Sequence, residues 1–118
     1  IYVFGGRNEI EEGEGVLQDL WTFNTETKQW KEVHQCGDDD DGIPESRSYA
    51  TACSCAGRFY LFGGCGANGR LSDLWCFDPE KGSWRRLPDP PGLKGRGGPT
   101  LEGMSSSDNG GGGEAEAR

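Results

Sequence analysis

Residues 2–87 are organised as short apolar runs separated by polar turns. The runs are rich in aromatic and aliphatic residues and are bounded by Gly, Asn, Asp or Pro, which is typical of β-strands. No segment combines sustained helical periodicity with capping residues. The pattern therefore predicts an all-β fold with strands at Tyr2–Phe4, Leu17–Asn24, Gln29–Val33, Tyr49–Ser54, Phe59–Phe62, Leu71–Phe77 and Ser83–Leu87.

Two of the expected strands share an apolar stretch that does not alternate. DLWTF at 19–23 and DLWCF at 73–77 carry apolar residues at neighbouring positions. A strand buried on one face would instead alternate apolar and polar residues. We therefore expect both faces of these strands to be buried, as in a sheet packed between two others.

The chain repeats itself. IYVFGG at 1–6 recurs 58 residues later as FYLFGG, and LQDLWTFNTETKQWKEV at 17–33 recurs 54 residues later as LSDLWCFDPEKGSWRRL. SRSYATA, which begins at residue 46, corresponds to GRGGPTL, which begins at residue 95. A period near 50 residues, with several short strands in each repeat, is typical of a propeller blade.

Each repeat has two glycines after an apolar strand and a tryptophan about twenty residues further on, a pattern that resembles the Kelch repeat. The resemblance implies a partial Kelch β-propeller of about two four-stranded antiparallel blades over residues 1–102. The glycines would allow a sharp turn and a close approach by a neighbouring strand. The tryptophans would fill the space between blades. The structural residues implied are Gly5, Gly6, Trp30, Gly63, Gly64 and Trp84.

The C-terminal segment of the chain differs from the repeats, whereas the N-terminus lies within one. Residues 103–118, GMSSSDNGGGGEAEAR, have almost no apolar content, so we expect a disordered tail. The chain begins at Ile1, inside the repeat pattern, and we read it as a truncated part of a longer protein. Two blades alone are expected to be marginally stable, because propeller blades depend on their neighbours.

Composition narrows the choice of partners. Hydrophobic residues make up 32% of the chain, glycine accounts for 21 of 118 residues, and the formal net charge is −8. An acidic chain repels nucleic acid and anionic membranes, and no apolar run reaches the roughly 18 residues that span a bilayer. We therefore expect neither a nucleic acid nor a membrane as partner.

The cysteines favour free thiols. Their number is odd and no CxxC pair occurs, which argues against a disulfide framework and against a zinc site. Free thiols are typical of a reducing compartment, so we expect the protein in the cytoplasm or the nucleus. The cysteines are Cys36, Cys53, Cys55, Cys65 and Cys76.

A narrower resemblance covers about residues 1–102. IYVFGGRNE from residue 1, PESRSYATACS from 44 and LPDPPGLKGRGGPTLEG from 87 are similar, in order and spacing, to blades of the plant nitrile-specifier and epithiospecifier proteins. That family diverts glucosinolate breakdown products to nitriles, epithionitriles or thiocyanates, with ferrous iron as cofactor. The resemblance implies specifier-like ancestry.

Two arginines match positions that open the innermost strand of a blade in that family. Arg47 lies in ESRSYA and Arg96 lies in KGRGGP. Either guanidinium would suit a sulfate- or thiolate-bearing ligand, because its fork of donors matches such anions. The alternative is a structural arginine that hydrogen-bonds loop carbonyls between blades.

The iron site of that family resembles a Glu-x-x-x-Asp-x-x-x-His segment, and this spacing does not occur in the chain. His34 has Trp30, not an acid, four residues before it. We therefore expect no catalytic or metal-binding residue and no cofactor in this chain, iron(II) being required only if a longer protein carries the segment elsewhere.

Three other motifs lack the context that they need. Gly64, Gly66 and Gly69 fit G-x-G-x-x-G, but a strand and not a helix is expected next. The acidic run 38–41 lacks the flanking ligands of a calcium loop. Glu11, Glu12 and Glu14 lie together in a loop, where surface charge is the ordinary role. Nothing supplies a nucleophile with its base.

The sequence thus favours a Kelch-repeat binding module that uses loops 7–16, 35–46 and 65–70 to recognise a protein or a small anionic ligand. Acidic loops favour basic partners. The alternative is a specifier-like protein acting on glucosinolate hydrolysis products. A third hypothesis is a remnant with no independent function.

Overall fold

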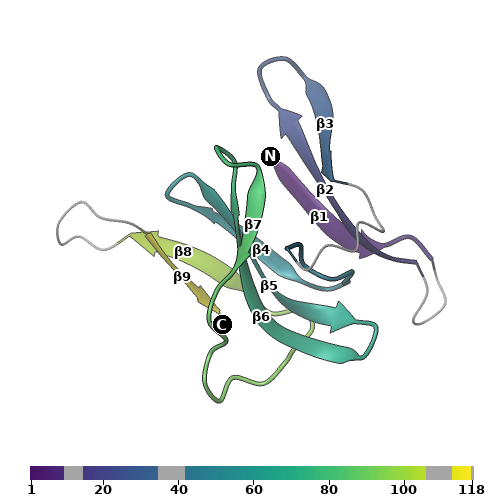
Figure 1. Ribbon diagram of the computed structural model, residues 1–118, viewed down its shortest axis with the longest axis vertical. Helices are drawn as coiled ribbons and strands as arrows, with labels where there is room; N and C mark the ends of the chain where they lie inside the picture. Colours follow the sequence, from purple (N-terminus) through teal and green to yellow (C-terminus); the bar gives the residue numbers. More distant parts are fainter. Residues whose placement is uncertain (10–14, 35–41, 106–112, 118) are drawn as a thin grey trace.

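The computed structural model describes residues 1–9, 15–34, 42–105 and 113–117. These residues form antiparallel strands and contain no helix of the length and apolarity needed to cross a membrane. Sheet A comprises β1 (Tyr2–Arg7), β2 (Val16–Asn24) and β3 (Gln29–His34), in that order. Sheet B comprises β4 (Thr51–Cys55), β5 (Arg58–Gly66), β6 (Gly69–Asp78) and β7 (Ser83–Arg86), also in chain order. Figure 1 shows sheet A in purple and blue and sheet B in teal and green.

The all-β prediction is confirmed, and each of the seven expected strands has a counterpart in β1–β7. The first and fifth strands run further than expected, through their paired glycines. Gly6 and Gly64 adopt a φ of 104°, and the strand register shifts between Phe4 and Gly6 and between Phe62 and Gly64. Each glycine pair therefore forms a β-bulge that bends the strand without ending it.

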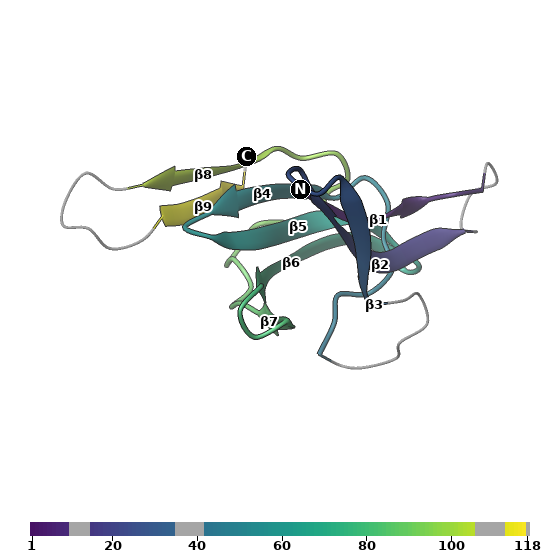
Figure 2. The same cartoon turned by 90° about the horizontal axis from the view of Figure 1, so that it is seen from above.

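A third, two-stranded sheet lies at the C-terminal end. β8 (Leu101–Ser105) pairs with β9 (Gly113–Ala117) and packs against β4 (Figures 1 and 2). Residues 103–105 and 113–117 belong to the segment that was expected to be a tail, and the expected boundary at residue 102 falls inside β8. β8 was missed because its sequence, LEGMS, has little of the β-branched and aromatic content that marks a strand.

Sheets A and B pack face to face around an aromatic core. Tyr2 stacks on Phe59 with ring centroids 4.8 Å apart, and Phe4 meets Trp84 edge to face at 5.5 Å. Trp84 also donates its indole N–H to Nε2 of His34 across the sheets at 2.8 Å. The buried members of the core are Leu20, Phe59, Leu61, Trp75, Phe77 and Trp84.

The two repeated tryptophans have different surroundings. Trp84 lies between the sheets and is 8% exposed, whereas Trp30 is 56% exposed and contacts Phe23 of its own sheet. Trp30 therefore departs from the expectation that it fills the space between blades. The reason is that the described residues contain no sheet on that side of sheet A.

Candidate functional site

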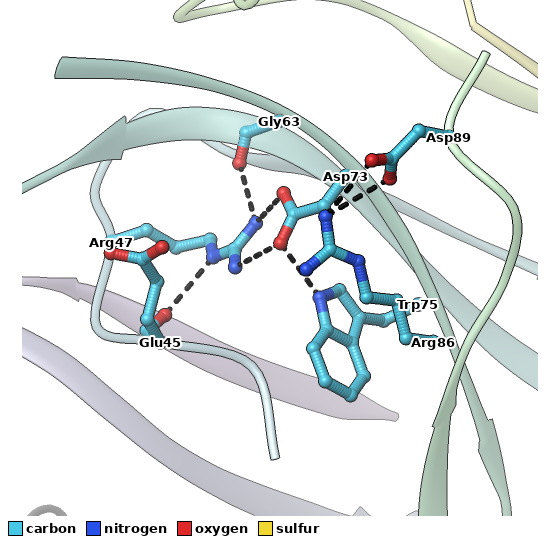
Figure 3. Close-up of polar contacts among 7 residues, drawn as sticks. All are labelled: Glu45, Arg47, Gly63, Asp73, Trp75, Arg86 and Asp89. Carbon is cyan, nitrogen blue, oxygen red and sulfur yellow. Dashed lines mark hydrogen bonds and ion pairs between the residues drawn. The ribbon is translucent and has the colours of Figure 1, made fainter. Parts of the chain in front are cut away.

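Arg47, one of the two arginines singled out by the sequence, is completely buried. Its guanidinium forms a two-pronged ion pair with Asp73, with Nη1 2.7 Å from Oδ1 and Nη2 2.8 Å from Oδ2. Nη1 also donates to the Gly63 carbonyl, and Nε donates to the Glu45 carbonyl, both at 3.0 Å (Figure 3). All three nitrogens are thus engaged within the protein, which favours the structural alternative for this residue.

Asp73 completes this buried network. Its Oδ2 also accepts the indole N–H of Trp75 at 2.7 Å. Burial by itself raises the pKa of Asp73, but the hydrogen bonds and positive charge of Arg47, together with the Trp75 bond, outweigh it and hold the pKa below the ordinary value. The pair is therefore charged at neutral pH and ties the segment before β4 to β6.

Figure 3 also shows the ion pair of Arg86 and Asp89, in which Nη2 lies 3.0 Å from Oδ1. Both side chains are more than half exposed. An exposed ion pair between residues three apart contributes little to stability, because water screens it. The buried pair of Arg47 and Asp73 is the one that organises this part of the fold.

Arg96 has the same backbone environment as Arg47. The Arg47 amide bonds the Leu17 carbonyl and its carbonyl accepts the Gly6 amide, both at 3.0 Å. The Arg96 amide bonds the Leu71 carbonyl at 3.0 Å, and its carbonyl accepts the Gly64 amide at 2.8 Å.

The side chain of Arg96 makes one of the contacts of Arg47 but lacks its ion pair. Its Nε donates to the carbonyl two residues earlier, at Lys94, as Arg47 does at Glu45. It forms no salt bridge with any residue that the structure describes. Arg96 therefore remains available as a predicted ligand contact.

The two glycines that follow each apolar strand are needed for different reasons. A Cβ on Gly5 or Gly63 would lie 3.0 Å from the carbonyl oxygen of Arg47 or Arg96, respectively. A Cβ on Gly64 would lie 2.7 Å from the Ser48 oxygen, whereas a Cβ on Gly6 would meet nothing within 4 Å. The segments that contain Arg47 and Arg96 thus leave no room for a side chain at Gly5 or Gly63. The segment that precedes β4 crowds Gly64 in the same way, whereas Gly6 has open space beside it.

A pocket of about 490 Å³ opens between Arg7 and Val16, at the adjoining ends of β1 and β2, and the turn between β5 and β6. We call it the loop pocket. Two arginines, Arg7 and Arg70, line it, and no carboxylate is among the lining residues of the described chain. Its lining residues are Arg7, Val16, Ser48, Tyr49, Cys65, Gly66, Ala67, Gly69, Arg70, Gly97 and Gly98.

Tyr49, which lines the loop pocket, has a strained backbone conformation. Its φ is 55°, in the left-handed region that side-chain-bearing residues rarely adopt, and its side chain is 66% exposed. The Gly98 amide donates to its carbonyl at 2.7 Å. Strain of this kind is concentrated at functional sites, because the surrounding structure must hold it in place.

The structure brings together two of the three loops expected to recognise a partner. Arg7 and Val16 of loop 7–16 line the loop pocket, together with residues 65–67, 69 and 70 of loop 65–70. Residues 42–46 of the third loop do not line it. Cys36, the acidic run 38–41 and the glutamates at 11, 12 and 14 lie outside the described residues.

The sequence analysis did not single out Arg7, Arg70 or Asp73. Asp73 left a trace, because a carboxylate recurs at Asp19 inside the repeated apolar motif DLW. A charge kept inside an apolar run indicates a buried partner. No feature of the sequence indicates that Arg7 and Arg70 lie at one pocket, because this depends on how the two sheets pack.

The structure also shows the surroundings of the remaining motifs. The strand β6 begins at Gly69, so no helix follows the G-x-G-x-x-G motif. The four cysteines of the described residues are free. No group of three or more His, Cys, Asp or Glu side chains gathers in metal-binding geometry within the described ranges.

The two sheets repeat the same strand order, and the segment that contains Arg47 leads from sheet A into the first strand of sheet B. This arrangement is that of a β-propeller repeat protein. A family model, the KLHDC2/KLHL20/DRC7 Kelch-repeats domain, matches residues 1–104. The chain therefore belongs to the Kelch-repeat family.

Similar curated proteins are diverse. The chain is 32% identical over 96 residues to N-(sulfonatooxy)prop-2-enimidothioate sulfolyase of Thlaspi arvense, covering 76% of this chain and 26% of that protein. It is 32% identical over 88 residues to the host cell factor homolog hcf-1 of Caenorhabditis elegans, covering 74% of this chain and 10% of that protein. Mouse Kelch-like protein 35 is 42% identical over 50 residues, 41% of this chain and 9% of that protein. The chain thus spans about a quarter or less of each of these relatives.

Proposed function

We propose that this Kelch-repeat unit is a binding module and that the loop pocket is its recognition site for an anionic group. The observation that carries the proposal is the pairing of Arg7 and Arg70 at one cavity of about 490 Å³. A cavity of this size suits a small ligand or a side chain of a protein partner.

Charge supports the anionic choice. Arg70 forms no salt bridge with the described residues, so its guanidinium is available to a ligand. Arg7 also lines the pocket, and it donates from Nε to the Glu9 carbonyl at 2.6 Å, which restricts the orientation of its guanidinium. Planar guanidinium groups bind carboxylate and sulfate through paired hydrogen bonds.

The acidic loops offer a second mode of recognition. The chain carries a formal net charge of −8, so a basic protein partner would be attracted to it as a whole. This mode predicts association that weakens as salt rises and that does not depend on Arg70.

A specifier-like role is the second candidate function, and the similarity to the sulfolyase of Thlaspi arvense favours it. The name of that relative contains a sulfonatooxy group, an anion that the arginines of the loop pocket suit. Ferrous iron would belong to this role only in a longer protein that carries the iron segment.

Amide-resolved NMR tests the binding site. The ¹⁵N-labelled chain is titrated with sodium sulfate and with penta-glutamate, against sodium chloride at matched ionic strength. The proposal predicts shifts at Gly66, Gly69, Gly97 and Gly98 that are lost in Arg70→Gln. Arg58→Gln is the matched control, because Arg58 is exposed and lies outside the loop pocket.

The outcomes separate the candidates. Shifts from sulfate but not from penta-glutamate favour the specifier-like role, and shifts from both favour recognition of an acidic peptide. Equal shifts in the parent chain and in Arg70→Gln overturn the proposal. Binding of penta-lysine that survives Arg70→Gln would assign recognition to the acidic loops instead.

A further inference from the structure

Tyr49 and Gly98 occupy equal positions of the repeat. SRSY at 46–49 corresponds to GRGG at 95–98, so a tyrosine stands in one repeat where the other has a glycine. Both residues lie in the left-handed region, with φ of 55° and 68°. Glycine adopts this region readily, whereas in other residues the Cβ comes too close to the backbone. The fold therefore uses the same conformation twice, and a glycine would satisfy it at position 49.

Hydrogen bonds hold the backbone on both sides of Tyr49. Ser48 exchanges two backbone bonds with Cys65, of 3.0 and 2.7 Å. The carbonyl of Tyr49 itself accepts the Gly98 amide at 2.7 Å. One residue further back, Arg47 is anchored by its buried ion pair (Figure 3). The surrounding structure thus fixes the strained conformation and, with it, the direction in which the tyrosine leaves the backbone.

Packing does not compensate for this strain. Tyr49 is 66% exposed and does not belong to the aromatic core between the sheets. Its Cβ lies 3.7 Å from the position that a Cβ on Gly97 would take, and both residues line the loop pocket. A tyrosine in place of a glycine therefore destabilises the fold at a wall of the loop pocket, which is the pattern expected of a residue that contacts a ligand.

The loop pocket also holds the arginines close to this tyrosine. Arg70 lies directly opposite Cys65 in the register of β5 on β6, and Cys65 in turn lies opposite Ser48. Neighbouring strands are about 4.8 Å apart, so roughly 10 Å separates the backbone of Arg70 from that of Ser48, next to Tyr49. An anionic group at the arginines thus leaves the rest of a small ligand within reach of the tyrosine.

We propose that Tyr49 determines the specificity of the loop pocket and that the ligand is an oxyanion carried on an aromatic ring, such as an aryl sulfate. The guanidinium groups bind the oxyanion through paired hydrogen bonds, and the ligand ring packs against the ring of Tyr49. Since Arg7 and Arg70 hold the oxyanion, this role of Tyr49 rests on the proposed function. A free aryl sulfate and a sulfated tyrosine of a protein partner share this chemistry.

The test compares phenyl sulfate with methyl sulfate, which carries the same anion without the ring. The ¹⁵N-labelled chain is titrated with each compound, and dissociation constants are taken from the amide shifts of Gly66, Gly69, Gly97 and Gly98. Phenyl sulfate is expected to bind about fivefold more tightly, because the aromatic pair adds to the affinity. Nuclear Overhauser effects are expected between the phenyl protons and the ring protons of Tyr49.

Tyr49→Asn removes the ring at a position where asparagine tolerates the left-handed region. It is expected to abolish the preference for phenyl sulfate and to leave the affinity for methyl sulfate unchanged. Tyr49→Phe is expected to keep the preference. Trp30→Ala is the matched control, because Trp30 is an exposed aromatic residue outside the loop pocket, and it is expected to change neither affinity.

Unfolding in urea separates a binding role from a structural one. Tyr49→Gly restores the residue of the other repeat and relieves the strained φ, so it is expected to lose the preference for phenyl sulfate without lowering the urea midpoint. A lowered midpoint would assign Tyr49 to the stability of the fold and overturn its role in recognition.

The remaining outcomes distinguish the two proposals. Equal affinities for phenyl and methyl sulfate, both weakened in Arg70→Gln, overturn the role of Tyr49 and support the anionic site. Affinities that Arg70→Gln leaves unchanged overturn the anionic site and the role of Tyr49 together. A sulfotyrosine peptide flanked by glycines identifies the source of the ligand: tighter binding than phenyl sulfate supports recognition of a protein partner, and weaker binding supports a small molecule.

Discussion

Truncating Asp73 to alanine would leave the Arg47 guanidinium fully buried without a counter-charge. The substitution also removes the acceptor for the indole N–H of Trp75. The two hydrogen bonds of the ion pair would be lost as well, while the bonds of Arg47 to two backbone carbonyls would remain.

The repeat supplies the scale for this prediction. Removing one partner of a buried ion pair costs about 3–5 kcal/mol, because the remaining charge stays desolvated. Asp19→Ala, the matched control, removes a single hydrogen bond to an indole, worth about 1 kcal/mol. The expected difference between the variants is therefore about 2–4 kcal/mol, a large part of the roughly 5–15 kcal/mol that stabilises a small domain.

Urea unfolding followed by tryptophan fluorescence measures the difference, at a concentration where both variants sediment as monomers. With a slope of about 1–2 kcal/mol per molar urea, the Asp73→Ala midpoint should lie at least about 1 M below that of Asp19→Ala. The double variant Arg47→Met/Asp73→Leu should be more stable than Asp73→Ala, because it removes the stranded charge. Coinciding midpoints for the two alanine variants would refute the reasoning.

Two further predictions concern the same core. Because the pKa of Asp73 is lowered from its ordinary value of 3.8, its pair stabilises the fold fully above that pH and loses this contribution as the pH falls through the lower, folded value. When the free energy of unfolding is measured as the pH is lowered, it should fall less steeply in Arg47→Met/Asp73→Leu than in the parent chain. An equal fall in the two proteins would contradict a lowered pKa for Asp73. Trp84→Ala should cost about 3–5 kcal/mol because Trp84 is buried. Trp30→Ala should change the stability of the monomer by no more than about half a kcal/mol, since Trp30 is more than half exposed. Calorimetry of the two variants compares them, and equal melting temperatures would exclude a core role for Trp84.

The candidate site was partly accessible from the sequence. Arg47 and Arg96 were singled out because they match positions that open the innermost strand of a blade in the specifier family, but the role of each depends on what its side chain contacts. Arg47 reaches a carboxylate 26 residues further on, across two strands. Arg96 has the same backbone bonds and no such carboxylate in the described chain. Equivalent positions of the repeat therefore have different surroundings.

The loop pocket was less accessible. Its loops were expected to recognise a partner, and loop 65–70 does line it. Arg7 and Arg70, however, are separated by 63 positions and belong to different sheets. Only the angle at which the sheets pack brings the two guanidiniums to one cavity, and no local pattern encodes that angle.

By itself, the sequence determined the repeat, the strands β1–β7 and the positions of the glycine pairs, because these depend on local periodicity and on backbone conformations that only glycine adopts readily. The tertiary structure decided which of two equivalent residues is buried. Trp84 is covered by sheet A while Trp30 is exposed, and Asp73 is paired while Asp19 is not. The physical reason is that burial and pairing in a propeller belong to the contact between neighbouring sheets, and a single repeat carries only one half of that contact.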